Sequence, residues 1–416
     1  MLQIRNVRLI DPAQHRDDIT DILVDNGRIH STGDAGSGLV ISESRDGNGL
    51  WLLPGLIDLG GHLPEPGYTQ KGTIESETRA ARSGGFTHIC SLPDTSPVAD
   101  TSAVIKLILE KAASAAQVHV LPLAALTQGL AGEQLASMVT LSEAGAVAMS
   151  NARHIIRDSY VLRRLMEYAA TYDIPVFLSA NDAALAAGGC MHEGPVSTRL
   201  GLPGIPATAE TVSLAKILLL AEQTGARLHI SQVSCGRSVL MLRQAREQGL
   251  NITADTPLAN LLYTHDAILG YRSLYNVQPP LRTEEDRQAL LAAVESGELA
   301  ISSNHRPHEI AAKKAPFAEA RPGMSQYDCF LPLAMTLVHR GELSLNALIR
   351  ALTVLPASVL RLQHGLSSGQ AFNACLFNPE TEQTISASDL YSQGHNHPAI
   401  GASLRGRVEE VFVSQV

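Results

Sequence analysis

The chain contains the segment Leu56-Ile57-Asp58-Leu59-Gly60-Gly61-His62-Leu63-Pro64-Glu65-Pro66-Gly67. Its first four residues form a short, largely apolar run, which is typical of a β-strand buried on both faces of a parallel sheet. The glycines, histidine and prolines that follow end the strand in a loop. In barrels of parallel strands, functional side chains lie at such carboxyl ends. The segment therefore predicts one barrel strand and the edge at which to seek a site.

Seven further runs have the same character and bring the strand candidates to eight. They are residues 56–59, 87–92, 118–124, 146–150, 175–179, 227–231, 251–255 and 300–304. Most are followed by an amphipathic stretch, such as 208–224 or 284–296. Eight alternating units predict an α/β fold, a (β/α)₈ TIM-like barrel over residues 54–359.

Both ends of the chain show a different sequence pattern from the region between them. Residues 1–53 alternate apolar and polar positions and contain Asn26-Gly27, a signal for a β-hairpin. Residues 360–416 repeat this alternation, most clearly over 404–413. Neither piece is long enough for a good core of its own, so we expect the two to pair into one small β-domain.

Composition excludes several classes of protein. The formal net charge is −9, without a block of like charges, so neither nucleic acid nor a membrane surface is an expected partner. No apolar stretch reaches the length of a membrane span and the N-terminus lacks a signal-peptide core, which predicts a cytoplasmic protein. The five cysteines are odd in number and widely spaced, so we expect buried free thiols.

The quoted segment resembles the D-x-H-x-H-x-R-E-P-G signature of dihydroorotases, which are members of the amidohydrolase superfamily. The resemblance extends over about residues 50–416 and implies an amidohydrolase-type barrel. In dihydroorotases the first strand supplies two metal-binding histidines, and the aligned residues here are Gly60 and His62. Glycine has no side chain, so the resemblance implies that one ligand is missing.

Other strand ends depart from the family pattern in the same way. Where the family places an aspartate, two histidines and a second aspartate that acts as general base, this chain has Asn151, Ser179, Gln232 and Asn304. A neutral amide is a weak zinc ligand and cannot accept a proton from a nucleophilic water. The departures predict a degenerate site with no catalytic residue, no metal and no cofactor.

The substrate pocket is altered as well. The family's carboxylate-binding arginine aligns with Pro64, and its asparagine in the M-P-N-T turn aligns with Asp94. Losing a bidentate cation and gaining an anion predicts that an acidic, dihydroorotate-like ligand is repelled.

The remaining histidines leave two interpretations open. A hydrogen-bonded core position is the expected role of His62, because one imidazole binds zinc poorly. Alternatively, His62, His305 and His308 form a relocated metal site, which would make the protein a metal-dependent cyclic amidohydrolase. The sequence leaves open whether the loop 309–322 is ordered, although Lys313-Lys314 and Ala315-Pro316 within it are typical of a mobile segment. By contrast, residues 193–206 look like the intact loop after the fifth strand of dihydroorotases.

One subgroup of the family resembles this chain most. It consists of inactive dihydroorotase homologues that accompany aspartate carbamoyltransferase in pyrimidine biosynthesis. This resemblance implies a pseudoenzyme that acts as a structural subunit, as a homodimer within a larger hetero-oligomer with the catalytic subunit of the transferase. A third hypothesis is a sensor that binds a ligand in the former active-site cleft.

Overall fold

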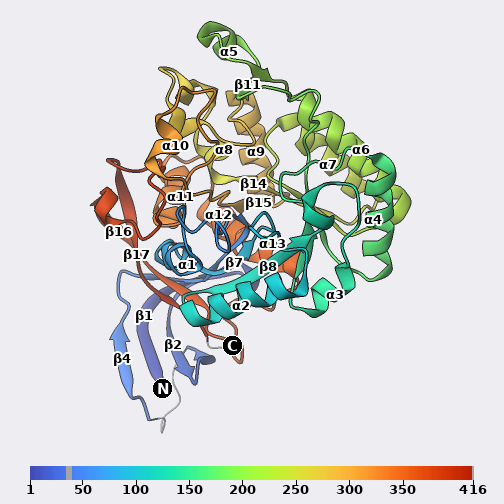
Figure 1. Ribbon diagram of the computed structural model, residues 1–416. Coiled ribbons are helices and arrows are strands. Elements are labelled where there is room, and N and C mark those ends of the chain that lie inside the picture. The colour runs from blue at the N-terminus through green and yellow to red at the C-terminus, as the bar shows by residue number, and fades with distance from the viewer. Residues whose placement is uncertain (34–39, 415–416) are drawn as a thin grey trace.

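The computed structural model describes residues 1–33 and 40–414. Its centre is an eight-stranded sheet in the order β15-β14-β13-β10-β9-β8-β7-β6, and every adjacent pair is parallel. The strands are β6 (Leu56–Gly61), β7 (Phe86–Ser91), β8 (His119–Ala125), β9 (Ala148–Ser150), β10 (Val176–Ser179), β13 (Leu228–Ser231), β14 (Ile252–Pro257) and β15 (Ala300–Ser302). Figure 1 shows them surrounded by helices.

The first and last strands of this sheet meet just beyond their carboxyl ends. The His62 backbone N–H donates to the carbonyl of His305 at 2.9 Å, and the Ser303 N–H donates to the Asp58 carboxylate at 2.8 Å. The sheet is therefore a nearly closed barrel, and the predicted (β/α)₈ fold is confirmed. All eight strand candidates form strands, with each end displaced by at most two residues.

Helices cover the outside of the barrel and lie in the segments that connect its strands. They are α1 (Ile74–Ser83), α2 (Ser102–Ala115), α3 (Met138–Glu143), α4 (Ser159–Thr171), α6 (Thr208–Thr224), α7 (Gly236–Glu247), α8 (Leu258–Leu262), α9 (Glu284–Ser296), α10 (Ile310–Lys314), α11 (Phe330–His339), α12 (Leu345–Leu352) and α13 (Val354–Leu360). Both amphipathic stretches named from the sequence, 208–224 and 284–296, are helices over those bounds. Among the described residues, no helix is long and apolar enough to cross a lipid bilayer.

A second sheet joins the two ends of the chain. It runs β17-β16-β5-β1-β2-β3, with β4 beside β1, and its strands are β1 (Leu2–Asp11), β2 (Arg16–Asp25), β3 (Arg28–Thr32), β4 (Glu43–Asp46), β5 (Trp51–Pro54), β16 (Ala374–Thr384) and β17 (Ser403–Phe412). Asn26 and Gly27, both with positive φ, form the turn between β2 and β3. The division of the chain at residues 53/54 and 359/360 into domains stays a prediction.

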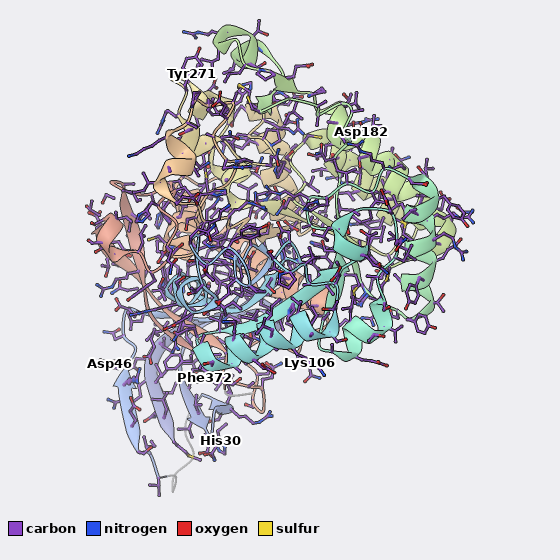
Figure 2. The ribbon with its side chains drawn as sticks, in the orientation of Figure 1. His30, Asp46, Lys106, Asp182, Tyr271 and Phe372 are labelled. Carbon is purple, nitrogen blue, oxygen red and sulfur yellow. The ribbon has the colours of Figure 1, made fainter. Side chains whose placement is uncertain are left out.

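An arm extends from the barrel between β10 and α6. It carries β11 (Met191–His192), α5 (Pro195–Leu200) and β12 (Gly204–Ile205), and β11 and β12 pair in parallel. Figure 1 shows it at the top, projecting beyond the other helices. The Tyr271 hydroxyl, labelled in Figure 2, donates to the Leu200 carbonyl at 2.8 Å and holds the arm to a neighbouring loop.

All five cysteines are free thiols, as expected. Four of them are buried, but Cys190 at the base of the arm is partly exposed, so the prediction of burial is wrong for that residue. The reason is that Cys190 lies in the projecting arm, outside the layers that cover the barrel strands.

Candidate functional site

The floor of the barrel mouth is a buried polar cluster around Asp58 of β6. The Asp58 carboxylate accepts hydrogen bonds from the Ser303 hydroxyl at 2.6 Å and the Tyr327 hydroxyl at 2.9 Å. Burial raises the pKa of Asp58, although these hydrogen bonds oppose the shift. Every hydroxyl in this cluster is already committed to the carboxylate, so the cluster ties β6 to the end of β15 and leaves no free nucleophile.

Gly60 lies where a side chain would point into the mouth. A Cβ atom built at this position would lie 3.4 Å from the Gln232 amide nitrogen and 3.8 Å from the Ser302 Cβ. These are ordinary contact distances. Packing at the Cβ position therefore does not require glycine here, and the missing side chain is a chemical difference from the family pattern rather than a steric necessity.

Asn151, after β9, is buried and fully used by its own surroundings. Its side-chain oxygen accepts from the Thr127 hydroxyl at 2.9 Å, and its amide nitrogen donates to the carbonyls of His154 at 3.1 Å and Leu130 at 3.3 Å. This side chain fixes the loops after β8 and β9. It is not directed to a ligand.

Gln232 and Asn304 face each other across the mouth. The Gln232 amide donates to the Asn304 side-chain oxygen at 3.0 Å, and the Asn304 amide donates to the Gln278 carbonyl at 2.9 Å. The Arg153 guanidinium donates to the same Asn304 oxygen at 2.5 Å and to the Gln232 oxygen at 3.3 Å. A cationic side chain therefore binds both residues at which the family pattern places metal ligands.

His62 and Asp94 form a second group at the mouth. The His62 Nε2 lies 3.5 Å from the Asp94 carboxylate, and the Arg306 guanidinium lies 3.0 Å from the same oxygen. Burial lowers the pKa of His62 to about 4, so its imidazole is neutral near pH 7. Burial disfavours the charge on Asp94, but His62 and Arg306 outweigh it and hold the pKa of Asp94 well below its usual range.

Two further predicted positions are structurally simple. Pro64 is buried and its carbonyl accepts from the Tyr68 N–H at 2.9 Å, so it starts the turn after β6. Ser179, at the end of β10, is half-buried and lines a cavity with Ser231 and Gln232. Neither residue supplies a charge to the mouth.

The residues present do not fit a divalent metal ion. Within the ranges 1–33 and 40–414, no three His, Cys, Asp or Glu side chains are grouped so that they could hold one. The positions that align with ligands carry amides, a hydroxyl or no side chain, and a metal would meet the charge of Arg153. The lining of the mouth is therefore unsuited to metal-activated hydrolysis.

The three histidines of the alternative metal site are not brought together as ligands. His305 Nε2 lies 2.9 Å from the Glu77 carboxylate, with both side chains fully buried, and its Nδ1 accepts the Gln326 N–H. His308 Nε2 donates to the Pro322 carbonyl at 3.0 Å. The interpretation of His62, His305 and His308 as a relocated metal site is wrong, because these side chains are not grouped around one point and both nitrogens of the His305 ring are already bonded.

The structure also describes the segment 309–322, whose order the sequence left open. Within this segment α10 forms, and the Lys313 ammonium donates to the carbonyls of Ser273 at 3.2 Å and Asn276 at 3.1 Å. The Arg321 N–H donates to the Ala312 carbonyl at 3.0 Å. These bonds anchor the segment to the barrel, which the polar sequence did not indicate.

Sequence reasoning missed the cations at the mouth. A cavity of about 420 Å³ is lined by His62, Asp94 and four basic residues, which are Lys71, Arg153, Arg306 and Arg321. Repulsion of an acidic ligand stays a prediction, and the lining opposes it, because Arg306 pairs with Asp94 and the other three cations remain. Arg153 follows Ser150 by three residues, and Arg306 follows Asn304 by two. Their place just after predicted strand ends could have indicated from the sequence that they lie at the mouth.

The barrel fold is shared with solved structures of hydantoinases. The L-hydantoinase (dihydropyrimidinase) of Arthrobacter aurescens superposes with a TM-score of 0.88 at 21% identity, covering 100% of this chain and 95% of that one. The dihydropyrimidinase of Brevibacillus agri gives 0.84 at 22% identity, covering 99% and 93%. At these identities the likeness concerns the fold alone.

Sequence comparison defines the family more closely. A family described as Dihydro-orotase-like matches residues 49–238. A protein of Pseudomonas aeruginosa called "Dihydroorotase-like protein" is 47% identical over 414 residues, covering 99% of this chain and 98% of the relative. A protein of Syntrophus aciditrophicus called "Dihydroorotase" is 41% identical, covering 97% and 96%. The chain belongs to the dihydroorotase-like family.

Proposed function

We propose that this protein is a catalytically inactive member of the dihydroorotase-like family that serves as a structural subunit for aspartate carbamoyltransferase. One observation carries the first half of the proposal. At the barrel mouth, the Arg153 guanidinium is bound to Asn304 and Gln232, the positions that align with the family's general base and one of its metal ligands.

Two chemical requirements of metal-dependent hydrolysis are unmet in this arrangement, and the orientation of Asn151 adds to the first. Activation of water needs an open metal position, and the ligand positions lack electron-pair donors of sufficient strength. It also needs a base that accepts a proton, and the Asn304 oxygen already accepts from two donors. Finally, the Asn151 amide is consumed by backbone carbonyls, so it cannot turn toward a ligand without breaking the loop.

The second half of the proposal rests on the resemblance to inactive homologues that accompany the transferase. In support, the barrel, its connecting helices and the arm between β10 and α6 are all retained around the altered mouth. A chain that has lost its chemistry but keeps its architecture is suited to holding other subunits. In this role it works as a homodimer within a larger hetero-oligomer.

Co-expression with the catalytic subunit of the transferase from the same organism tests the proposal. We expect the two chains to co-purify, and we expect omission of this chain to reduce both the native mass of the complex and the transferase activity. The matched control is the transferase chain expressed alone at equal concentration. Equal assembly and equal activity without this chain would refute the scaffold role.

A second candidate, a metal-dependent cyclic amidohydrolase with an altered site, is favoured by one observation. Relatives called "Dihydroorotase" are 36–41% identical over nearly the whole chain. Metal analysis of the purified protein, combined with a dihydroorotate hydrolysis assay, separates the two candidates. Stoichiometric zinc together with turnover would favour the enzyme.

A further inference from the structure

We propose that the cavity at the barrel mouth lined by Lys71, Arg153, Arg306 and Arg321 binds a small, multiply charged oxyanion. This mouth cavity has a volume of about 420 Å³, enough for a small metabolite. The inference does not depend on the scaffold role. It concerns what the altered cleft recognises, whichever subunits surround it.

The charges in the mouth cavity are not balanced by the protein. Arg306 pairs with Asp94 at 3.0 Å, but among the described residues no carboxylate lies within ion-pair distance of Lys71, Arg153 or Arg321. Glu309 influences Lys71 electrostatically without reaching it. Three cations around one cavity repel each other, and an anion placed among them would relieve that repulsion.

Arg153 is the most informative of these cations. Its hydrogen-bond partners are the neutral side chains of Asn304 and Gln232, and its Nε is buried without a partner. Burial lowers the pKa of Arg153 to about 9, which still leaves it charged near pH 7. Asp94 acts on Arg153 only through space and forms no ion pair with it, so a bound oxyanion would supply a direct partner for this guanidinium.

Two further buried polar atoms belong to residues that line the mouth cavity. The Nδ1 atoms of His62 and His308 have no hydrogen-bond partner, and both side chains are less than 10% exposed. Because burial lowers the pKa of both rings, each is neutral and offers one donor or one acceptor. The cavity therefore combines fixed positive charge with unsatisfied polar groups.

The four cations come from four separate loops. Lys71 precedes α1, Arg153 follows β9, Arg306 follows β15, and Arg321 follows α10. None of them occupies the position of Pro64, where the family pattern has its carboxylate-binding arginine. The recognition of an anion here is thus a property of this chain's own loops.

Calorimetric titration of the full chain with pyrophosphate and, separately, with succinate tests the proposal. Ionic strength is held constant so that general screening does not change. We expect saturable binding of at least one of the two, and the stronger ligand tells whether phosphate groups or paired carboxylates are preferred. Acetate, a monoanion, should bind much more weakly than either.

Three variants test the assignment to the mouth cavity. We expect Lys71→Gln, Arg153→Gln and Arg321→Gln each to weaken binding about tenfold, the loss of one charge-assisted contact. Lys106→Gln is the matched control, because Lys106 projects from the exposed side of α2 outside the cavity (Figure 2).

The Arg321→Gln variant tests whether a loss of anion binding could result from misfolding instead of a lost contact. Arg321 is exposed and its side chain makes no hydrogen bond among the described residues, so Arg321→Gln should keep the wild-type melting temperature. The proposal fails if neither pyrophosphate nor succinate binds saturably, or if binding is the same in wild type, Arg153→Gln and Arg321→Gln.

Discussion

At the scale of single residues, the mouth of this barrel differs from a metal site by more than its missing ligands. Arg153 adds a positive charge next to Gln232 and Asn304, and Arg306 adds another next to Asp94. Gln232 and Asn304 are thus both part of a hydrogen-bond network with Arg153. Restoring one ligand therefore leaves the network unfavourable to a metal ion.

Replacement of Gln232 by histidine tests this statement. We expect Gln232→His not to hydrolyse dihydroorotate, even with added zinc, because Arg153, Asn304 and Gly60 still deny a metal its other ligands and the water its base. The measurement is turnover in a coupled assay, with wild type as the baseline. Measurable turnover in the single variant would count against the degenerate-site interpretation.

A different result is expected at Asn151. The variant Asn151→Asp restores the family's residue type, but it replaces a donor with an acidic oxygen that faces the carbonyls of Leu130 and His154. We expect a loss of roughly 2–4 kcal/mol in the free energy of unfolding. The loss should grow as pH rises and the new carboxyl ionises.

Denaturant titration measures this change. Asn346→Asp on α12 is the control, because Asn346 is exposed and its side chain makes no hydrogen bond among the described residues. A stability of Asn151→Asp equal to that of wild type would mean that Asn151 does not hold the two loops together.

At the scale of elements, β6 shows why neighbouring glycines have different roles. A Cβ atom at Gly61 would lie 1.7 Å from the Tyr327 hydroxyl and 2.8 Å from the Asp58 carboxylate, so Gly61 lets Tyr327 approach the strand. At Gly60 the nearest atom is at 3.4 Å. One glycine is required by packing and the other is not.

The pair of substitutions Gly61→Ala and Gly60→Ala turns this difference into a measurement. We expect Gly61→Ala to lower the free energy of unfolding by about 2–5 kcal/mol, since it displaces Tyr327 from its bond to the buried Asp58. Gly60→Ala should change it by about 1 kcal/mol or less. Equal effects in thermal unfolding would contradict the assigned role of Tyr327.

At the scale of the whole molecule, buried neutral histidines make the fold sensitive to acid. Burial lowers the pKa of His62, His192 and His397 to about 4 and that of His308 to about 3. The unfolded chain therefore binds protons at these groups first as pH falls. Their contribution to stability is complete above pH 6.5 and is lost as pH falls toward 4.

We expect the free energy of unfolding to fall steeply between pH 6.5 and 4, with each such histidine contributing about 1.4 kcal/mol per pH unit. Asp328, whose pKa burial raises to about 6, and Asp58, whose pKa burial also raises, oppose the trend, but these carboxyl groups are fewer than the histidines. His397→Gln should reduce the slope of the free energy of unfolding against pH by the contribution of one histidine. His395→Gln, at an exposed position two residues earlier, should not.

Features of the fold and the site could be predicted where they depend on a local sequence pattern. The barrel followed from eight apolar runs, because a strand buried on both faces needs continuous apolar sequence whatever its neighbours are. The Asn26-Gly27 hairpin followed from backbone conformation alone. The altered positions Gly60, Asn151, Ser179, Gln232 and Asn304 could be named because they stand at strand ends.

The sequence by itself thus determined the barrel and the residue types at its carboxyl edge, since both depend on positions set by local periodicity. Only the tertiary structure decided which side chains these residues meet. Arg153 meets Asn304 and Gln232, and Lys71, Arg306 and Arg321 converge on one cavity, because closure of the barrel brings together loops that are 15 to 250 residues apart in the chain. Electrostatic contacts between such loops depend on distance in space, which no local pattern encodes.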